Sequence, residues 1–166
     1  MSTNDNLQEA FAGESQANRK YLFFAEKADE GGQKQLARLF RAAAEAETVH
    51  ARNHLKVLDG IKSDKENLEA AVSGEHEEFT SMYPGFIEEA KKESNGQAER
   101  SFDLANKVEK VHHGLFQKAL KDLEAGKKAE DAPMYVCQVC GYTVEGEARE
   151  RCPICGAPRA KFKNID

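Results

Sequence analysis

The sequence predicts an all-α four-helix bundle followed by a small module of strands and loops that a metal ion holds together. Three observations support this prediction. Four stretches of the 166-residue chain repeat apolar residues with the 3.6-residue period of an α-helix. Glycine-containing reversals separate the first stretch from the second and the third from the fourth. All four cysteines lie between positions 137 and 155, in two Cys-x-x-Cys pairs.

The composition limits the classes of function that are compatible with the chain. Charged residues make up 32% of it and the net charge is −5, so no nucleic-acid partner is expected. The mean hydropathy is −0.71 and no long apolar run occurs, so no membrane span is expected either. The first residues lack the basic and apolar pattern of a signal peptide, and paired cysteines in an unexported chain favour a metal site over disulfides. We therefore expect a cytoplasmic protein.

Turn and cap signals set the limits of the four helical segments. The first ends at Gly31–Gly32 and the second at Gly60. A capping box at Ser63–Glu66 begins the third, and Pro84 is expected to kink or locally break it. Asn95–Gly96 then reverses the chain into the fourth. The segments cover roughly residues 5–30, 33–59, 63–94 and 97–125.

Two of these helices carry a carboxylate and an imidazole three residues apart, in Glu47-Thr-Val-His50 and Glu109-Lys-Val-His112. This spacing places both side chains on one helix face, about one turn apart. The other two helices carry glutamates on their apolar stripes, where a charge is costly unless it is paired or bound to a metal. Together these features match the ligand set of ferritin-like di-iron bundles. The candidate ligands are Glu14, Glu47, His50, Glu75, Glu78, Glu109 and His112.

The positions of these residues agree with one shared site. Glu14 and Glu47 each stand ~24 Å from the first reversal, at ~1.5 Å per residue, so they are expected at the same height. Oxygen and imidazole ligands without a thiolate favour iron or manganese over zinc. The alternative, a solvated surface residue, would explain any single glutamate but not seven candidates on four stripes. Four carboxylates balance two divalent cations, so Glu78 is expected to bind only the oxidised site, in exchange with His50.

Some polar residues near the ligands have candidate roles in catalysis. Glu78 and His50 are candidates because they would exchange at the metal. Tyr21 and Tyr83 are candidates because they could donate a hydrogen bond to a ligand carboxylate, although a tyrosine at such a position is most often a core residue. Spacing favours His112 over its neighbour as a ligand. Solvent contact or a supporting role is expected for three other histidines, which are His54, His76 and His113.

The connection between the two hairpins is short. In a ferritin-like bundle the second and third helices run parallel, so a long crossover joins them. Here the intervening chain, about Asp59 to Ser63, reaches only ~17 Å of the ~35 Å required. We therefore expect a homodimer in which the helical hairpins are swapped between subunits.

The C-terminal part contains Cys137-Gln-Val-Cys140 and, further on, Cys152-Pro-Ile-Cys155. Four thiolates from two such turns make a closed tetrahedral site for zinc or for one iron, and their spacing does not distinguish the two metals. A structural zinc ribbon is the alternative for this four-cysteine site. The di-iron bundle favours iron, because a site that turns over needs electrons one at a time. We predict a bundle at 1–126, a linker at 127–133 and a metal-stapled module at 134–166.

Several stretches together resemble one known family over nearly the whole chain. They are Phe11–Asn18, Glu45–Ala51, Gly74–Pro84, Glu109–His112 and the pairs Cys-x-x-Cys-Gly and Cys-Pro-x-Cys-Gly. The chain resembles the rubrerythrin family, with a rubredoxin-like module at its end. This resemblance implies two iron ions in the bundle, held by the seven candidate ligands with His50 as the redox-dependent one. It also implies one iron ion in the four-cysteine site, which zinc could replace in recombinant material.

The resemblance also implies an activity. Rubrerythrins are non-haem di-iron peroxidases that reduce hydrogen peroxide to water, with electrons that come from a reduced pyridine nucleotide through a separate reductase and the rubredoxin-type iron. We expect the same of this chain, and we expect the linker to leave the module near the di-iron site of a second subunit. Two other functions share some of the features: iron oxidation and storage, and a binding protein with a zinc ribbon and a metal-free bundle.

Overall fold

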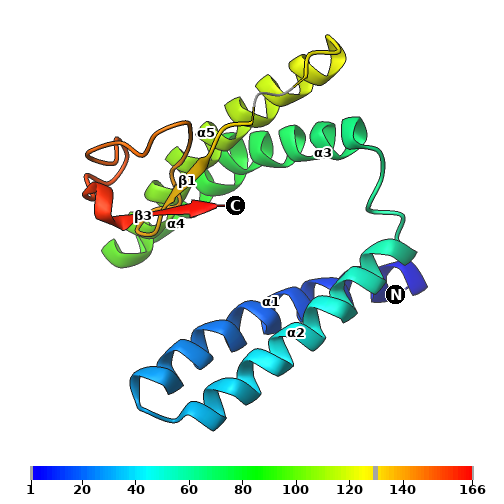
Figure 1. The fold of residues 1–166 in the computed structure, drawn as a ribbon, viewed down its shortest axis with the longest axis vertical. Helices are drawn as coiled ribbons and strands as arrows, with labels where there is room; N and C mark the ends of the chain where they lie inside the picture. The colour runs from blue at the N-terminus through cyan, green and yellow to red at the C-terminus, as the bar shows by residue number, and fades with distance from the viewer. Residues whose placement is uncertain (1, 129–130, 166) are drawn as a thin grey trace. The chain divides into compact units, whose positions relative to one another are not determined.

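The structure is a computed structural model that describes residues 2–128 and 131–165. It divides the chain into two compact units, Met1–Lys62 and Ser63–Asp166. The first unit holds two helices, and the second holds the remaining helices and a small three-stranded sheet (Figure 1). The predicted fold class, a helical bundle with a cysteine-rich module at the C-terminus, is therefore confirmed. The exchange of hairpins between subunits stays a prediction.

The first unit is an antiparallel helical hairpin of α1 (Thr3–Glu30) and α2 (Lys34–Val57) (Figure 1). Three small buried residues, Ala25, Ala28 and Ala37, let the two helices approach closely, and Phe40 packs against them. The reversal needs a left-handed residue, and Gly32 supplies it with a φ of 71°. The helix limits agree with the predicted segments to within a few residues.

In the second unit, the third predicted segment divides into three parts. Helix α3 (Asp64–Glu77) begins at the predicted capping box, in which Ser63 and Glu66 each accept a hydrogen bond from the backbone of the other. A π-helical turn, η1 (Glu78–Met82), follows, and helix α4 (Tyr83–Lys92) continues from it. Helix α5 (Gly96–Glu124) then packs against both α3 and α4.

The expected local break at Pro84 is confirmed, and its form is the π-helical turn. Proline has no backbone N–H and its ring clashes with the carbonyl of an ordinary helical turn before it. In the structure the Tyr83 N–H bonds to the Glu78 carbonyl, five residues back, and Pro84 occupies the first turn of α4. A π-helical turn inserts one residue without ending the helix, and such turns often mark functional sites.

The two helical hairpins repeat each other with an offset of 62 residues. Each contains one tyrosine and two phenylalanines in mutual ring contact, and the two phenylalanine rings lie 5.5 Å apart in both hairpins. The matching residues are Tyr21, Phe24 and Phe40 in the first hairpin and Tyr83, Phe86 and Phe102 in the second. The left-handed turn residues, Gly32 and Ser94, follow the same offset.

The repeat is broken once, at the π-helical turn. Glu14 lies seven residues before Tyr21, whereas Glu75 lies eight residues before Tyr83. The inserted residue of the π-helical turn lies between Glu75 and Tyr83 and accounts for the difference. The second hairpin therefore presents one more carboxylate, that of Glu78, close to its ligand candidates.

The C-terminal module consists of β1 (Met134–Cys137), β2 (Thr143–Glu145), a short 3-10 turn (Arg159–Lys161) and β3 (Phe162–Ile165). The strands form an antiparallel sheet in the order β2-β1-β3. Its small core includes a residue from outside the module, because Val108 of α5 is buried with Cys137, Tyr142 and Cys152. The module therefore packs against a helix of its own chain, and the expectation that it lies near the di-iron site of a second subunit stays a prediction.

The limits predicted for the bundle, linker and module stay predictions. Residues 129 and 130 of the predicted linker lie outside the described residues, as do Met1 and Asp166. None of the helices in the described part of the chain combines the length and apolar character that a bilayer-crossing helix requires.

The packing of Val108 generates a prediction about how the module is held. Val108→Ala should weaken the contact between α5 and the module by about 2 kcal/mol, because it removes buried methyl groups and leaves a cavity. Amide hydrogen exchange around residue 108 and in β1 should accelerate, and the linker should be cut faster by trypsin. Val139→Ala is the matched control, because Val139 is 54% exposed. Equal protection in both variants would contradict the packing described.

Candidate metal centres

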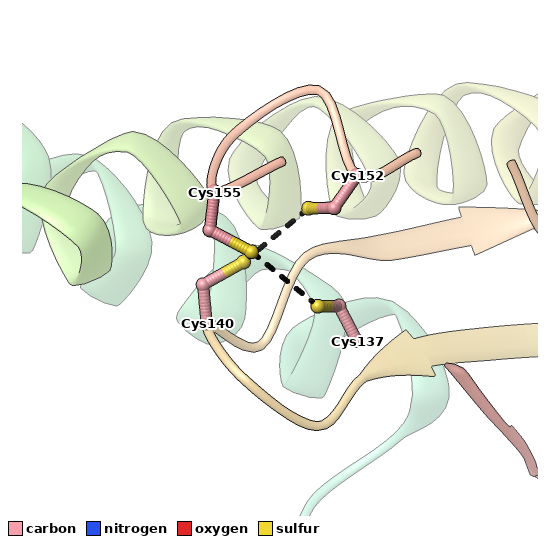
Figure 2. Close-up of side chains that lie close together, drawn as sticks. All are labelled: Cys137, Cys140, Cys152 and Cys155. Atoms are coloured by element: carbon pink, nitrogen blue, oxygen red, sulfur yellow. Dashed lines mark hydrogen bonds between the residues drawn. The ribbon is translucent and has the colours of Figure 1, made fainter. Parts of the chain in front are cut away.

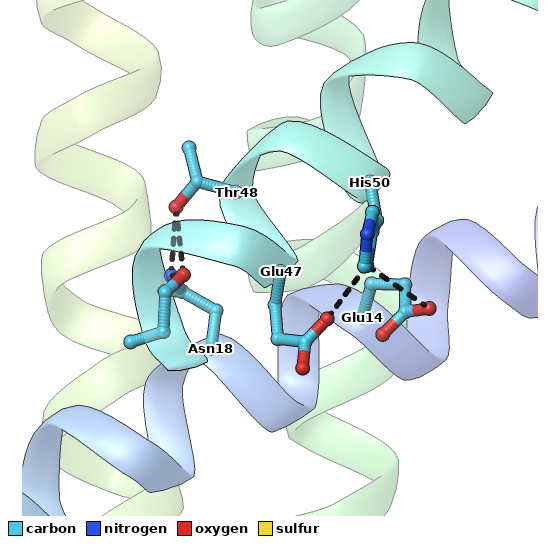
Figure 3. A network of polar contacts seen from close by, with 6 residues as sticks. Glu14, Asn18, Glu47, Thr48 and His50 are labelled. Carbon is cyan, nitrogen blue, oxygen red and sulfur yellow. Dashed lines mark hydrogen bonds and ion pairs between the residues drawn. The ribbon is translucent and has the colours of Figure 1, made fainter. Parts of the chain in front are cut away.

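The first hairpin gathers Glu14 from α1 with Glu47 and His50 from α2 (Figure 3). His50 Nδ1 lies 2.8 Å from Glu47 Oε2 and 3.9 Å from Glu14 Oε1. A polar contact next to this triad fixes the helix pair, because Asn18 Nδ2 donates to Ala44 O at 2.7 Å and to Thr48 Oγ1 at 2.8 Å. The equal heights predicted for Glu14 and Glu47 are confirmed by this geometry.

The second hairpin gathers the equivalent triad, Glu75 from α3 with Glu109 and His112 from α5. His112 Nδ1 lies 2.7 Å from Glu109 Oε2 and 3.9 Å from Glu75 Oε1, nearly the same geometry as in the first triad. The opposite ring nitrogen, Nε2, lies 2.9 Å from Thr143 Oγ1 of the C-terminal module. The structure therefore brings six of the seven predicted bundle ligands into two triads of identical composition.

The carboxylates of the second triad are partly buried, with side-chain exposures of 20% for Glu75 and 17% for Glu109. Burial, together with a hydrogen bond and repulsion from Glu109, raises the pKa of Glu75 from its ordinary value of 4.5 to about 7. Burial and the charge of Glu109 also raise the pKa of Glu78. Glu75 Oε2 is buried and has no hydrogen-bond partner. An oxygen in this state is costly unless a cation or a donor reaches it.

These observations fit a pair of iron ions. Each triad offers two carboxylates and one imidazole nitrogen, the donors that iron accepts readily, and the two triads together offer four carboxylates for two divalent charges. The buried, unpartnered oxygen of Glu75 is the position at which a bound cation removes the energetic cost. The assignment of these individual residues as iron ligands stays a prediction.

Glu78 lies at the first position of the π-helical turn, outside the two triads. It is near enough to interact electrostatically with Glu109 and His112, and the two have opposite effects on its pKa. Its predicted binding to the oxidised site in exchange with His50 stays a prediction.

The two candidate tyrosines lie in the matching aromatic clusters of the two hairpins. The pKa of Tyr83 is raised by burial and by the charges of Glu109, Glu78 and Glu75, which places its hydroxyl within the field of the second triad. Among the described residues, no hydrogen bond joins the hydroxyl of Tyr21 or Tyr83 to a carboxylate. Their catalytic role stays a prediction.

The neighbouring histidines occupy different environments. His113 Nδ1 donates to the backbone carbonyl of Val72 at 3.0 Å, and its ring contacts those of His76 and Phe79. His113 therefore faces away from the carboxylates, and His112 is the histidine of the triad. His54 follows His50 by four residues on α2.

The four cysteines form the third candidate site (Figure 2). Cys137 Sγ lies 3.7 Å from Cys155 Sγ, and Cys140 Sγ lies 3.5 Å from Cys152 Sγ. A tetrahedral ion with ~2.3 Å bonds to sulfur separates its ligands by ~3.8 Å, so the four sulfurs are arranged to hold one ion. All four cysteines are free of disulfides, and burial raises the pKa of the Cys140 thiol. The site fits one iron ion.

Two glycines shape the turns of this site. Gly141 and Gly156 follow Cys140 and Cys155 and have φ values of 86° and 76°. Their backbone N–H groups donate to Cys137 O at 2.8 Å and to Cys152 O at 2.9 Å. Only a residue without a Cβ adopts this conformation without strain, which explains the Cys-x-x-Cys-Gly pattern.

Thr143 and the π-helical turn are two features of the site that sequence reasoning missed. No pattern distinguishes Thr143 from any other strand residue. The π-helical turn had a signal, because the offset of 62 residues between the hairpins changes to 61 at Glu75. Counting the repeat would have located the inserted residue between positions 75 and 83.

The pKa of Glu75 generates a prediction about the metal-free protein. The folded-state pKa of about 7 is above the ordinary 4.5, so the protonated group stabilises the fold at low pH and this contribution is lost as the pH rises through 7. At pH 8 the metal-free Glu75→Gln variant should therefore unfold about 5 °C higher than the metal-free wild type, and the difference should vanish towards pH 5.

The same variant should bind Fe²⁺ or Co²⁺ more weakly than the wild type, so its effects on apoprotein stability and on metal affinity have opposite signs. Thermal unfolding followed by circular dichroism and anaerobic metal titration would measure the two. Glu77→Gln, which makes the same charge change at an exposed position of α3, should alter neither. A less stable Glu75→Gln apoprotein at pH 8 would contradict the assigned burial of charge.

Comparison with known proteins agrees with this geometry. The rubrerythrin family profile matches residues 5–120, and the profile of the rubredoxin-like domain of rubrerythrin matches residues 135–163. Rubrerythrin-2 of Clostridium acetobutylicum is 37% identical over 97% of this chain and 95% of the relative. Nigerythrin of Nitratidesulfovibrio vulgaris is 36% identical over 97% of this chain and 85% of the relative.

A solved structure supports the same relationship. The structure described as the fully reduced, all-ferrous state of nigerythrin superposes with a TM-score of 0.59 and 36% identity, over 99% of this chain and 87% of that one. The two family profiles and the two relatives agree with each other. They also agree with the two triads and the four-cysteine module seen in the structure. The chain belongs to the rubrerythrin family.

Proposed function

We propose that this protein is an oxidoreductase that reduces hydrogen peroxide to water at a di-iron site in the helical bundle. Electrons would reach that site through an iron ion in the four-cysteine site, from an external reductase that uses a reduced pyridine nucleotide. The observation that supports this most strongly is the contact between the two kinds of site. His112 of the second triad hydrogen-bonds to Thr143, which lies three residues after Cys140 of the four-cysteine site.

The chemistry of the two sites is complementary. A pair of ferrous ions supplies two electrons together, which is the number that cleavage of one peroxide O–O bond to water consumes. An iron ion bound by four thiolates carries one electron at a time, so it would serve to reduce the pair again after each turnover. A module that is only a structural zinc ribbon would have no need to contact a di-iron ligand.

The protein side chains supply the binding and the charge balance. The four triad carboxylates would hold the two cations and offset their charge. Glu78, at the π-helical turn, would add a carboxylate when the charge of the ions increases. Tyr83 lies within the field of the same carboxylates and is the candidate to donate a proton to bound peroxide.

We further propose that the complete site forms between two chains. Each triad provides half of the ligands, and only residues 58–63 connect α2 to α3. In a bundle with parallel second and third helices, Glu47 and Glu75 would each be about ten residues from that connection, so the chain would have to return ~30 Å with six residues. Six residues span ~20 Å at most.

The second unit has a surface that a partner hairpin would cover. A groove of about 1090 Å³ runs along α3 and α5, lined by apolar residues that include Leu68, Ala71, Phe116 and Ala119. These residues continue the helical stripes that carry Glu75 and Glu109. The first hairpin likewise leaves Phe24, Leu36 and Leu39 exposed. Pairing of these apolar surfaces would bury them and bring the two triads together.

A complementation experiment tests the exchange of hairpins. When a Glu47→Ala chain and a Glu109→Ala chain are co-expressed with different tags, a swapped heterodimer contains one bundle with no defect and one with two. It should therefore bind about half of the wild-type bundle iron, whereas either variant alone should bind almost none. A heterodimer without intact sites would show that each bundle forms within one chain.

A second variant separates the two proposed redox steps. Cys140→Ser should abolish peroxide turnover driven by a reductase, because it removes a ligand of the one-electron site. Oxidation of the pre-reduced bundle iron by one equivalent of peroxide, followed by stopped-flow absorption, should proceed at the wild-type rate. Gln138→Ala, an exposed change within the same turn, is the control and should leave both steps intact. Loss of the single oxidation in Cys140→Ser would contradict the separate roles.

A further inference from the structure

The ring of His112 is held at both nitrogens. Nδ1 faces Glu109 Oε2 at 2.7 Å, on the side of the triad. Nε2 faces Thr143 Oγ1 at 2.9 Å, on the side of the C-terminal module. The threonine hydroxyl in turn donates to the backbone carbonyl of Gly141 at 3.1 Å, and Gly141 directly follows Cys140. A continuous line of hydrogen bonds and backbone thus runs from the second triad to a cysteine of the four-cysteine site.

The direction of these hydrogen bonds is fixed once a cation binds at Nδ1. A neutral imidazole then keeps its single proton on Nε2, which donates to Thr143 Oγ1. The threonine proton points to Gly141 O, so the oxygen is free to accept. A histidine that binds a metal almost always gives its second N–H to an acceptor of this kind, which sets the tautomer and the ring orientation.

We propose that Thr143 is a positioning residue of the di-iron site, through which the C-terminal module of a chain holds the metal-binding nitrogen of His112 in that same chain. The ligand that His112 would bind is a divalent transition-metal cation. This inference rests on the proposed function only in taking that cation to be iron. Thr143 touches neither the cation nor the substrate. Its effect passes through the imidazole ring.

Within the described residues, the equivalent histidine of the first triad lacks a hydrogen-bond partner of this kind for its second ring nitrogen. His50 is equivalent to His112 by the offset of 62 residues, and its Nδ1 contacts Glu47 at nearly the same distance. Its side chain is 53% exposed, against 26% for His112. In the described part of the first unit, no hydrogen-bond partner lies near His50 Nε2. The two triads therefore differ at this nitrogen: His112 Nε2 has a hydrogen-bond partner in the described residues, and His50 Nε2 has none there.

Thr143 is not needed to seat the module. Lys118 Nζ lies 2.6 Å from Glu145 Oε2 at a second point along α5, and Val108 is buried within the core of the module at a third. Removal of the threonine hydroxyl should therefore leave the module docked while it releases the His112 ring. This separation makes the role of Thr143 testable.

The contact also defines an electron route that stays within one chain. An iron ion held by the four cysteines would pass one electron at a time to a ferric ion in the bundle and so become ferric itself, and the external reductase proposed above would return it to the ferrous state. Cys140, the Gly141 carbonyl, Thr143 and His112 form the connection. Two such transfers return the pair of ions to the state that one peroxide molecule oxidises.

The test compares Thr143→Val, which has the same shape without the hydroxyl, with Thr143→Ser, which keeps it. Co²⁺ binding to the bundle of the full-length protein, with zinc already in the four-cysteine site, is followed by visible absorption. We expect Thr143→Val to weaken the tighter Co²⁺ site by about 10-fold or more. Thr143→Ser should bind within a few-fold of the wild type. Lys118→Met, which removes the contact between Lys118 and Glu145 of the module, should bind as the wild type does.

Wild-type affinity in Thr143→Val, or an equal loss in Lys118→Met, would overturn the proposal. A second measurement follows electron transfer from the ferrous iron of the four-cysteine site to the oxidised bundle. This transfer should slow in Thr143→Val while the absorption spectrum of the four-cysteine site is unchanged. Neither measurement requires peroxide. If the protein proved inactive with peroxide, the Co²⁺ result would still decide the role of Thr143, so the two proposals fail separately.

Discussion

The rest of this structure depends on one constraint: the triad carboxylates bring negative charges close together, and each hairpin is only half of a four-helix bundle. Each hairpin holds two carboxylates and one imidazole within a few ångströms, and the second hairpin buries an oxygen of Glu75 that no donor reaches. An arrangement of this kind lowers the stability of a metal-free chain, and divalent cations remove the cost. The apolar groove along α3 and α5 would have a similar consequence for assembly, because the proposed pairing with a second helical hairpin would cover it.

The internal repeat explains how one sequence forms a site with two different halves. The offset of 62 residues gives both hairpins the same triad and the same aromatic cluster, a near-symmetric frame for two cations. Two departures then make the halves unequal. The π-helical turn adds Glu78 on one side, and on that side Thr143 contacts the histidine. The exchange proposed between Glu78 and His50 would require such inequality.

Sequence reasoning predicted much of this, and the limits of that prediction have physical causes. The helices, their reversals and the two Glu-x-x-His pairs follow from local periodicity and spacing, so Glu47, His50, Glu109 and His112 fall where they were expected. The packing of the module on α5 was not predictable, because a contact between Val108 and the core around the cysteines depends on tertiary structure. Thr143 was missed for the same reason. The swapped hairpins rest on an argument about chain length and stay a prediction.

The most direct test of the account is Mössbauer spectroscopy of the full-length protein loaded with ⁵⁷Fe and oxidised. If the carboxylates of the two hairpins bridge one pair of ions, two of the three irons per chain should be ferric ions coupled to a diamagnetic ground state. The third should show the signature of a tetrahedral sulfur site. Two magnetically isolated ferric ions in the bundle would show instead that each triad binds its own cation, and would contradict a shared di-iron site.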